Sequence, residues 1–336
     1  MTEQDKPRTA SEAQLTDMTK SAIKEQTISA FNSLGWTKVV APAKVNLVLG
    51  IGARREDGYH KATSLLHALN IHDVVYLRKA YAGPGAGLSI RLSCTGVGDI
   101  EVPDIAPEDN IAYKAVALLA EQLGRAEDET IEIHIEKNIP FQAGLGGGSA
   151  DAAAALVGAA RLWGIAPDDP VLEAVAPKLG ADVAFFLRGG CGLYRGAGDV
   201  FERALAPMKQ AVALVKPACG VSTAAAYAAF DADPCAIDDA VLTAADQAQS
   251  AEEVMLFNNL APAAESLAPE LAEVKSWLDA QAGVRQALLC GSGATTFAVC
   301  ESFEAALAVV AEARRRGWWA RATSFGSLRA SVVPQR

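Results

Sequence analysis

The glycine-rich stretch at residues 139–156, IPFQAGLGGGSADAAAAL, constrains the fold and the chemistry of this chain more than any other segment. Four glycines within residues 144–148 remove side chains from a turn, so that backbone N–H groups can point at a ligand. Ser149 is a favourable helix N-cap residue, and the alanines after it favour a helix. Because the first amides of a helix lack internal acceptors and lie at the positive end of its dipole, the sequence predicts a phosphate site here.

This loop differs from the two commonest phosphate-binding loops. A Walker A loop ends in Gly-Lys-Ser/Thr, but no lysine lies between Lys137 and Lys178. A dinucleotide-binding fingerprint needs a glycine where this chain has Ser149. The alternative is a flexible linker ahead of an alanine-rich helix, which is less favoured because linkers seldom run straight into so strong a helix start.

The composition limits the class of protein. At 336 residues the chain is long enough for one large domain or two of ordinary size. A formal charge of −10 argues against non-specific nucleic-acid binding, and no window is apolar enough to span a membrane. Residues 1–33 lack the apolar segment of a secretory signal. Six cysteines without a Cys-x-x-Cys pair suit reduced thiols, so we expect a cytoplasmic protein with neither a zinc site nor a disulfide framework.

The order of the predicted elements indicates two α+β units after a polar N-terminal extension. Residues 1–35 mix both signs of charge, which is compatible with a helix over about 12–31 or with disorder. The glycine-rich residues 188–198 interrupt the chain, so we expect one domain over 36–195 and a second over 196–336, each a sheet layered with helices. Strands are expected at residues 44–51, 72–77, 88–92, 130–137, 210–217 and 318–324, and as a pair joined by a glycine turn within 286–300; helices are expected at 109–123, from 152, at 169–178, after a cap at Ser222 or Thr223, at 269–282 and at 304–316.

Other polar residues stand at strand faces and turns. In the first predicted strand, alternate aliphatic residues share one face, which puts Lys44 and Asn46 side by side on the other. An ordinary solvated face is the alternative for this pair. Asp182 stands at the edge of an apolar run, where it could instead cap a short helix. Tyr59 and His60 follow a turn signal, and aromatic residues in a loop serve as surface cover as often as they bind ligands.

Three segments together resemble the three signature motifs of the GHMP kinase superfamily: PAKVNL at 42–47, PFQAGLGGGS at 140–149 and LCGSGATTF at 289–297. The runs REDGYH at 55–60 and LGADV at 179–183, with the triple glycine, resemble the branch that acts on a cytidine diphosphate-linked methylerythritol. The resemblance covers about residues 38–330. The departures from the family pattern are mild and concern residues Phe141, Gln142, Ala150 and Ala184.

The resemblance implies a two-domain α+β fold with the active site in the cleft between the domains. It implies ATP-dependent phosphorylation of the 2-hydroxyl of the methylerythritol compound, with Mg²⁺, in the non-mevalonate isoprenoid pathway. A homoserine or mevalonate kinase, a decarboxylase of the superfamily and a non-catalytic nucleotide-binding protein are the alternatives. The Tyr59-His60 pair favours the cytidine substrate, and the presence of both Lys44 and Asp182 argues against a mere binder, which needs no proton acceptor.

The resemblance also implies roles for individual residues. Asp182 would be the catalytic base and Lys44 the cation that orients it, because a neighbouring ammonium favours the charged carboxylate. Asp151 should face away from the phosphates or help to bind the metal, for which Ser149 is also a candidate. The expected ATP-binding residues are Pro140, Phe141, Gln142, Ala143, Gly144, Leu145, Gly146, Gly147, Gly148, Ser149 and Ala150, with Asn110 and Lys137 near the adenine. The expected substrate-binding residues are Asn46, Tyr59, His60, Gly291, Ser292 and Gly293.

Overall fold

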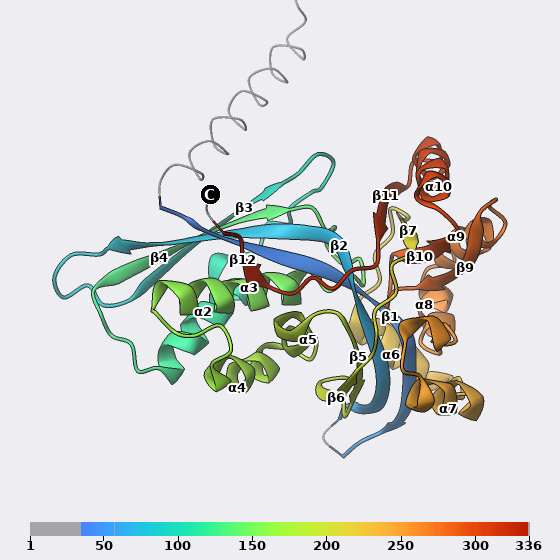
Figure 1. Ribbon diagram of the computed structural model, residues 1–336, viewed down its shortest axis with the longest axis horizontal. Coiled ribbons are helices and arrows are strands. Elements are labelled where there is room, and N and C mark those ends of the chain that lie inside the picture. Colours follow the sequence, from blue (N-terminus) through green and yellow to red (C-terminus); the bar gives the residue numbers. More distant parts are fainter. Residues whose placement is uncertain (1–34, 57, 335–336) are drawn as a thin grey trace, which may run out of the picture.

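A computed structural model describes residues 35–56 and 58–334 of the chain (Figure 1). The helix expected over about 12–31 lies outside the described residues, as does the rest of the extension up to residue 34.

The larger of two sheets is built on a long antiparallel pair, β1 (Thr37–Arg54) and β2 (His60–Tyr81). The separate strand predicted at 72–77 is therefore only one part of β2. Both strands are longer than predicted. Their buried aliphatic residues continue well beyond the short segments on which the prediction was based. Among the described residues this sheet has eight strands. Its main strand order is β12 (Ser331–Val332), β1, β2, β4 (Glu129–Lys137) and β3 (Ser89–Gly96). Three further strands pair with this path: β5 (Cys191–Arg195) pairs with β2, β6 (Val200–Ala204) with β5, and β8 (Phe257–Asn258) with β1.

Helices cover one face of this sheet (Figure 1). The central one is α3 (Gly147–Leu162), in which residues 150–160 are all buried between the sheet and its neighbouring helices. Its small side chains permit close packing, and a Cβ added at Gly158 would lie 2.2 Å from a methyl carbon of Leu77. The helices around α3 are α2 (Ile111–Gln122), α4 (Pro170–Leu179) and α5 (Val183–Arg188), and the 3-10 turn η1 (Pro107–Asp109) precedes α2.

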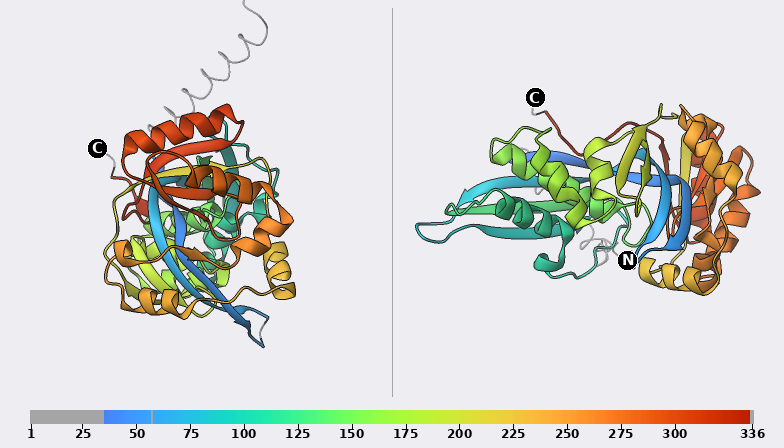
Figure 2. Two further views of the ribbon diagram at one scale, coloured as in Figure 1. Left: turned by 90° about the vertical axis from the view of Figure 1, so that its right-hand side faces the viewer. Right: turned by 90° about the horizontal axis from the view of Figure 1, so that it is seen from below.

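The second sheet has the order β11-β7-β10-β9 and lies beside the first along the long axis of the molecule (Figure 2). One face packs against α9 and α10, and the other shares a core with β1 and β2, in which Val45, Leu65, Leu214 and Phe297 are fully buried. Its strands are β7 (Ala211–Lys216), β9 (Val284–Leu289), β10 (Thr296–Cys300) and β11 (Trp319–Ser324); the accompanying helices are α6 (Thr223–Ala232), α7 (Asp239–Gln247), the 3-10 turn η2 (Ala251–Glu253), α8 (Ala261–Leu267), α9 (Glu270–Asp279) and α10 (Phe303–Arg315).

The two layered units expected from the sequence are present as two sheets with their helices. A domain boundary near residue 195 stays a prediction, and three strands beyond it, β6, β8 and β12, return to the larger sheet. The first sheet is therefore completed by segments from the whole length of the described chain.

Candidate active site

A pocket of about 930 Å³ lies where the two sheets meet, and it is lined by residues from both. Most of the residues singled out in the sequence line it. They are Lys44, Asn46, Asn110, Lys137, Asp182, Gly291, Ser292 and all of residues 140–149. Tyr59, His60, Ala150 and Gly293 do not, whereas Asp151 does.

Strand β1 supplies the first two polar groups of the pocket. Lys44 and Asn46 are both about 95% buried, so the alternative of an ordinary solvated strand face is wrong. The Lys44 ammonium donates to Asn46 Oδ1 at 2.9 Å, and Asn46 Nδ2 donates to Ser64 Oγ on β2 at the same distance. Asn46 therefore fixes the direction of the lysine side chain.

The glycine loop joins β4 to α3 in the order expected of a phosphate site. The helix begins at Gly147, however, after Gly146 in the left-handed region at φ 73°, so Ser149 lies within the first turn and is not the N-cap. A Cβ at Gly146 would lie 2.7 Å from the ring of Phe186 and 3.0 Å from Cγ of Lys44. Glycine is thus required here both by backbone conformation and by the close approach of two side chains.

Backbone hydrogen bonds tie the loop to the other two motifs. Lys44 N donates to Leu145 O at 2.9 Å, which attaches β1 to the loop. The amides of Ala294 and Thr295, beyond the β9–β10 turn, donate to the carbonyls of Gln142 and Ala143, each at 3.2 Å. These contacts involve only main-chain atoms, and they bring three distant motifs to one place.

Asp182 immediately precedes α5 and faces the ammonium of Lys44. It occupies the N-cap position of this short helix, as the alternative interpretation expected, but its carboxylate makes no capping hydrogen bond. Its Oδ2 lies 3.4 Å from Lys44 Nζ, and its side chain is 31% exposed. The carboxylate therefore has a positive partner and a face open to the pocket.

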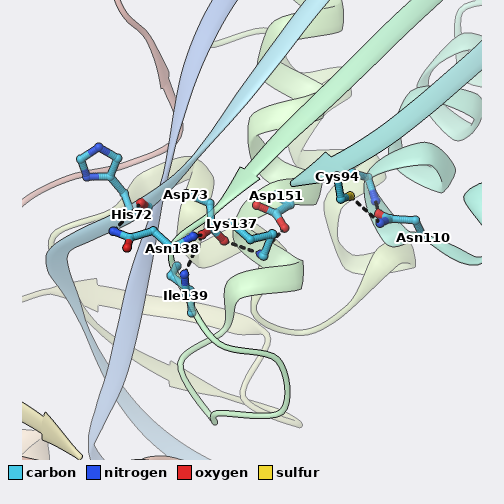
Figure 3. Close-up of polar contacts among 9 residues, drawn as sticks. His72, Asp73, Cys94, Asn110, Lys137, Asn138, Ile139 and Asp151 are labelled. Atoms are coloured by element: carbon cyan, nitrogen blue, oxygen red, sulfur yellow. Dashed lines mark hydrogen bonds and ion pairs between the residues drawn. The ribbon is translucent and has the colours of Figure 1, made fainter. Parts of the chain in front are cut away.

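A second lysine, Lys137, lies between Asp73 and Asp151 where β4 leads into the glycine loop (Figure 3). Lys137 Nζ forms ion pairs with Asp73, on β2, and with Asp151, in the first turn of α3, the latter at 2.5 Å. Burial alone would lower the pKa of Lys137, but the two carboxylates raise it above its ordinary value. Burial raises the pKa of Asp151, opposed by Lys137 and reinforced by the charge of Asp73. Asp151 thus faces Lys137, an arrangement that the sequence could not specify.

The pocket continues from Lys137 toward β3 and α2. Asn110 caps α2 by accepting the amide of Ala112 at 2.9 Å, and its Nδ2 lies 3.9 Å from the sulfur of Cys94 (Figure 3). Burial raises the pKa of the Cys94 thiol to about 11, so this group is neutral near pH 7. Apolar side chains, among them Val102 and Ile111, complete this end of the pocket.

At the other end, the pocket is lined by Thr223 and Tyr227 of α6. Thr223 Oγ1 lies 2.9 Å from Ser292 Oγ, so α6 meets the β9–β10 turn here. Ser222, one of the two predicted caps, stands at the N-cap position of α6, but its side chain makes no capping hydrogen bond. The ring of His60 lies tilted beside that of Tyr227, with 5.2 Å between ring centroids, and His60 Nε2 lies within hydrogen-bond distance of Asp231 Oδ1, at 2.6 Å.

The remaining predicted residues lie close to the pocket without lining it. His60 is buried behind Tyr227, whereas the side chain of Tyr59 is 65% exposed at the start of β2. Ala150, in the first turn of α3, is fully buried in the core, and Gly293 packs near the leucine side chains of β9 and α9. Four residues at or beside the pocket could not be identified as site residues from the sequence: Asp73, Thr223, Tyr227 and Asp231. The sequence around each is typical of a strand or helix, and each comes near the pocket only when distant segments pack together.

The six cysteines are all free in the structure. Cys191, Cys290 and Cys300 are buried, and Cys235 is exposed. Across residues 35–56 and 58–334, no group of three or more His, Cys, Asp and Glu side chains is arranged to hold a metal ion. Within the same residues, no helix is both long and apolar enough to cross a bilayer.

Comparison with known proteins decides the family. The models of the N-terminal and C-terminal GHMP kinase domains match residues 110–190 and 241–317. The chain is 39% identical over 285 residues to 4-diphosphocytidyl-2-C-methyl-D-erythritol kinase of Desulfitobacterium hafniense (strain Y51), covering 84% of this chain and 93% of that one. The chain belongs to this kinase family. The same enzyme of Nocardia farcinica (strain IFM 10152) is 39% identical, with 82% and 88% of the two chains covered.

Solved structures agree with this assignment. A crystal structure of 4-(cytidine 5'-diphospho)-2C-methyl-D-erythritol kinase superposes with a TM-score of 0.68 at 32% identity, covering 86% of this chain and 99% of that one. Homoserine kinase from Cytophaga hutchinsonii superposes with a TM-score of 0.63 at 22% identity over 90% and 98% of the chains, which shows a shared fold alone. The chain is therefore a GHMP kinase with the α+β fold expected of that family, and ATP is one of its substrates.

Proposed function

We propose that this kinase transfers the γ-phosphoryl group of ATP to the 2-hydroxyl of 4-diphosphocytidyl-2-C-methyl-D-erythritol, giving the 2-phosphate and ADP, in the non-mevalonate isoprenoid pathway. The observation that carries the proposal is the Lys44–Asp182 pair at 3.4 Å beside the glycine loop, in a chain 39% identical to kinases named for that substrate. Homoserine and mevalonate kinases share the fold at 22% identity or less, so they are the weaker alternatives.

Asp182 acts as the proton acceptor for the attacking hydroxyl. Its carboxylate is partly open to the pocket and makes no capping bond, so an oxygen is available to a substrate. Lys44, 3.4 Å from that carboxylate, orients it and offers a donor to the incoming hydroxyl or to the transferring phosphoryl group. The proton passes from the 2-hydroxyl to Asp182 as the new O–P bond forms and the bond to ADP breaks.

The glycine loop binds the ATP phosphates. The first amides of α3, which begins at Gly147, have no acceptor within the helix, and the helix dipole favours negative charge beside them. The pocket extends from this loop to Asn110, Cys94 and Val102, where a planar base would meet apolar side chains. We assign the adenine to this end.

The cytidine end of the acceptor lies beside α6 and β2. Tyr227 lines the pocket and contacts the ring of His60, whose imidazole is oriented by Asp231. The exposed ring of Tyr59 provides a further aromatic face beside His60 for a pyrimidine. Near the reacting centre, Asn46 and the turn Gly291 to Gly293 contact the methylerythritol or its phosphates.

Mg²⁺ is the proposed metal cofactor. Its preferred ligands are oxygens, and it usually binds through substrate phosphates with one or two protein ligands. The residues present fit this pattern, because the hydroxyl of Ser149, in the first turn of α3, lines the pocket beside the glycine loop. Ser149 would hold the ion together with the ATP phosphates, and the ion would neutralise phosphate charge when bound.

The test is to offer the purified protein ATP and Mg²⁺ with the cytidylated methylerythritol, homoserine, mevalonate or diphosphomevalonate, and to measure ADP and carbon dioxide. We expect ADP only with the first acceptor, no carbon dioxide, and a new phosphate monoester at the 2-position by phosphorus NMR. ADP released only with homoserine would overturn the proposal. Chelation of divalent metal should abolish turnover, and restored Mg²⁺ should recover it.

A further inference from the structure

We infer that Asp73, Lys137 and Asp151 form a brace that joins the two ends of the phosphate-binding loop and sets its shape for ATP. The three residues are positioning residues, which act through the loop, and the inference rests on the proposed function of that loop. The brace is built from three separate elements, since Asp73 belongs to β2, Lys137 ends β4, and Asp151 lies in the first turn of α3 (Figure 3).

The entry of the loop is held by Asp73. Its Oδ1 accepts the backbone amides of Asn138 at 2.5 Å and Ile139 at 2.8 Å, the first two residues after β4. Asp73 is fully buried, so water does not compete for these hydrogen bonds. The carboxylate thereby fixes the direction in which the chain leaves the sheet.

The exit of the loop is held by Asp151. Its Oδ2 accepts a hydrogen bond from Lys137 Nζ at 2.5 Å, and the side chain is 6% exposed. Its Oδ1 is buried and has no hydrogen-bond partner among the described residues. The bond to Lys137 therefore links the start of α3 to the end of β4 across the base of the loop.

One ammonium joins both ends. Lys137 Nζ donates to Asp73 Oδ2 as well as to Asp151 Oδ2. The same nitrogen lies 3.4 Å from the position of a Cβ at Gly147, the first residue of the helix. A loop whose ends are fixed in this way presents its amides with little conformational freedom to lose on binding, so nucleotide affinity is gained without any direct contact between Asp73 or Asp151 and ATP.

The test compares Asp151→Ala with Asp151→Asn. The alanine variant releases the helix end and leaves Lys137 paired one to one with Asp73, so no unpaired buried charge results. The asparagine variant keeps an oxygen for Lys137. We expect Asp151→Ala to raise the KM for ATP and the Kd for ADP about tenfold, with the KM for the acceptor within about twofold, and Asp151→Asn to stay close to the parent.

Two further readouts separate a brace from other roles. Backbone amides at 139–149 should exchange hydrogen faster in Asp151→Ala, while those of β1 and β2 stay protected. ADP binding measured in EDTA should show the same loss as in Mg²⁺. If the loss appeared only with Mg²⁺, Asp151 would be a metal ligand and the brace would be rejected.

Glu132→Gln is the matched control. Glu132 on β4 pairs with Arg78 on β2, so it forms an ion pair between the same two strands but away from the loop. Equal effects of Glu132→Gln and Asp151→Ala on nucleotide affinity would overturn the inference. If Asp151→Ala does not fold, Asp73→Asn serves instead, because its Oδ1 can keep the two backbone amides while the link to Lys137 is lost.

Nucleotide turnover by the parent protein distinguishes the two proposals. A parent that does not release ADP contradicts the proposed function. A parent that turns over, together with an Asp151→Ala variant whose ADP affinity and loop exchange match the parent, contradicts the brace alone.

Discussion

Two lysines flank the glycine loop, and their surroundings differ in one decisive respect. Lys44 meets one carboxylate at 3.4 Å and one amide oxygen at 2.9 Å. Lys137 meets two carboxylates within hydrogen-bond distance, both of them buried. The first ammonium stands beside a single, partly exposed acid, whereas the charge of the second is opposed by two buried carboxylates.

The difference teaches that two buried lysines beside one loop can have very different electrostatic surroundings. Adjacent glycines bring the two lysines close, since a Cβ at Gly146 would meet Lys44 and one at Gly147 would approach Lys137. We therefore expect changes at the Lys44 side to alter the rate, and changes at the Lys137 side to alter stability and nucleotide affinity.

Asp182→Asn gives the largest expected effect. Loss of the proton acceptor should lower kcat about 10³-fold, while the free energy of unfolding changes by at most about 1–2 kcal/mol because the side chain is partly exposed. Steady-state kinetics and urea denaturation of the same preparation check both. Activity within a few-fold of the parent would show that Asp182 is not the base.

Lys137→Met should act mainly on stability. It leaves Asp73 and Asp151 buried without their cation, which costs about 3–5 kcal/mol. The measurement is the free energy of unfolding from urea denaturation at pH 7. A variant as stable as the parent would show that the two carboxylates do not depend on Lys137.

Lys44→Met should lower the catalytic rate more than the stability. Removal of one charge-stabilising donor lowers kcat about 10²-fold. Because Asp182 can turn to water, stability should fall less than in Lys137→Met. The comparison is sharpest when both variants are measured side by side by the same two assays. Equal stability losses in the two lysine variants would remove the distinction drawn between them.

Gly146→Ala is the smallest expected change. A methyl group at φ 73° would lie 2.7 Å from Phe186 and 3.0 Å from the side chain of Lys44, so both must shift. We expect kcat/KM for ATP to fall about tenfold, because the methyl group adds about one to two kcal/mol of strain to the loop. Gly124→Ala controls for backbone strain, since Gly124 has φ 60° but no atom within 4 Å of its Cβ position. A similar loss of activity in both would rule out a specific clash.

The sequence predicted the fold class and most residues of the pocket. Local patterns sufficed for β4, α2 and α4, whose bounds differ from the predicted ones by a few residues at most, and for the strand–loop–helix order of the phosphate site. The start of α3 was predicted less well. The helix begins at Gly147, directly after Gly146 in the left-handed region, and therefore earlier than a cap at Ser149 would allow.

The remaining features depend on contacts between distant segments. No local pattern could show that β1 is buried on both faces, because one face is covered only when the second sheet packs against it. In the same way, the sequence around Asp73 shows only one acidic residue in a long strand. Its role depends on contacts with Lys137 and the loop amides, which come from distant segments. Tyr227 and Asp231 join His60 only through the position of α6.

The pairing of β12 with β1 has a consequence for the order of folding. Val39 lies opposite Val332, and Ala330 N donates to Phe186 O nearby, so β1 is paired with a segment that is synthesised long after it. Contacts of such long sequence separation form late, after a large loop has been closed. While the chain is still on the ribosome, β1 presents an open edge, which makes the nascent protein a candidate for chaperone protection until residue 332 is released.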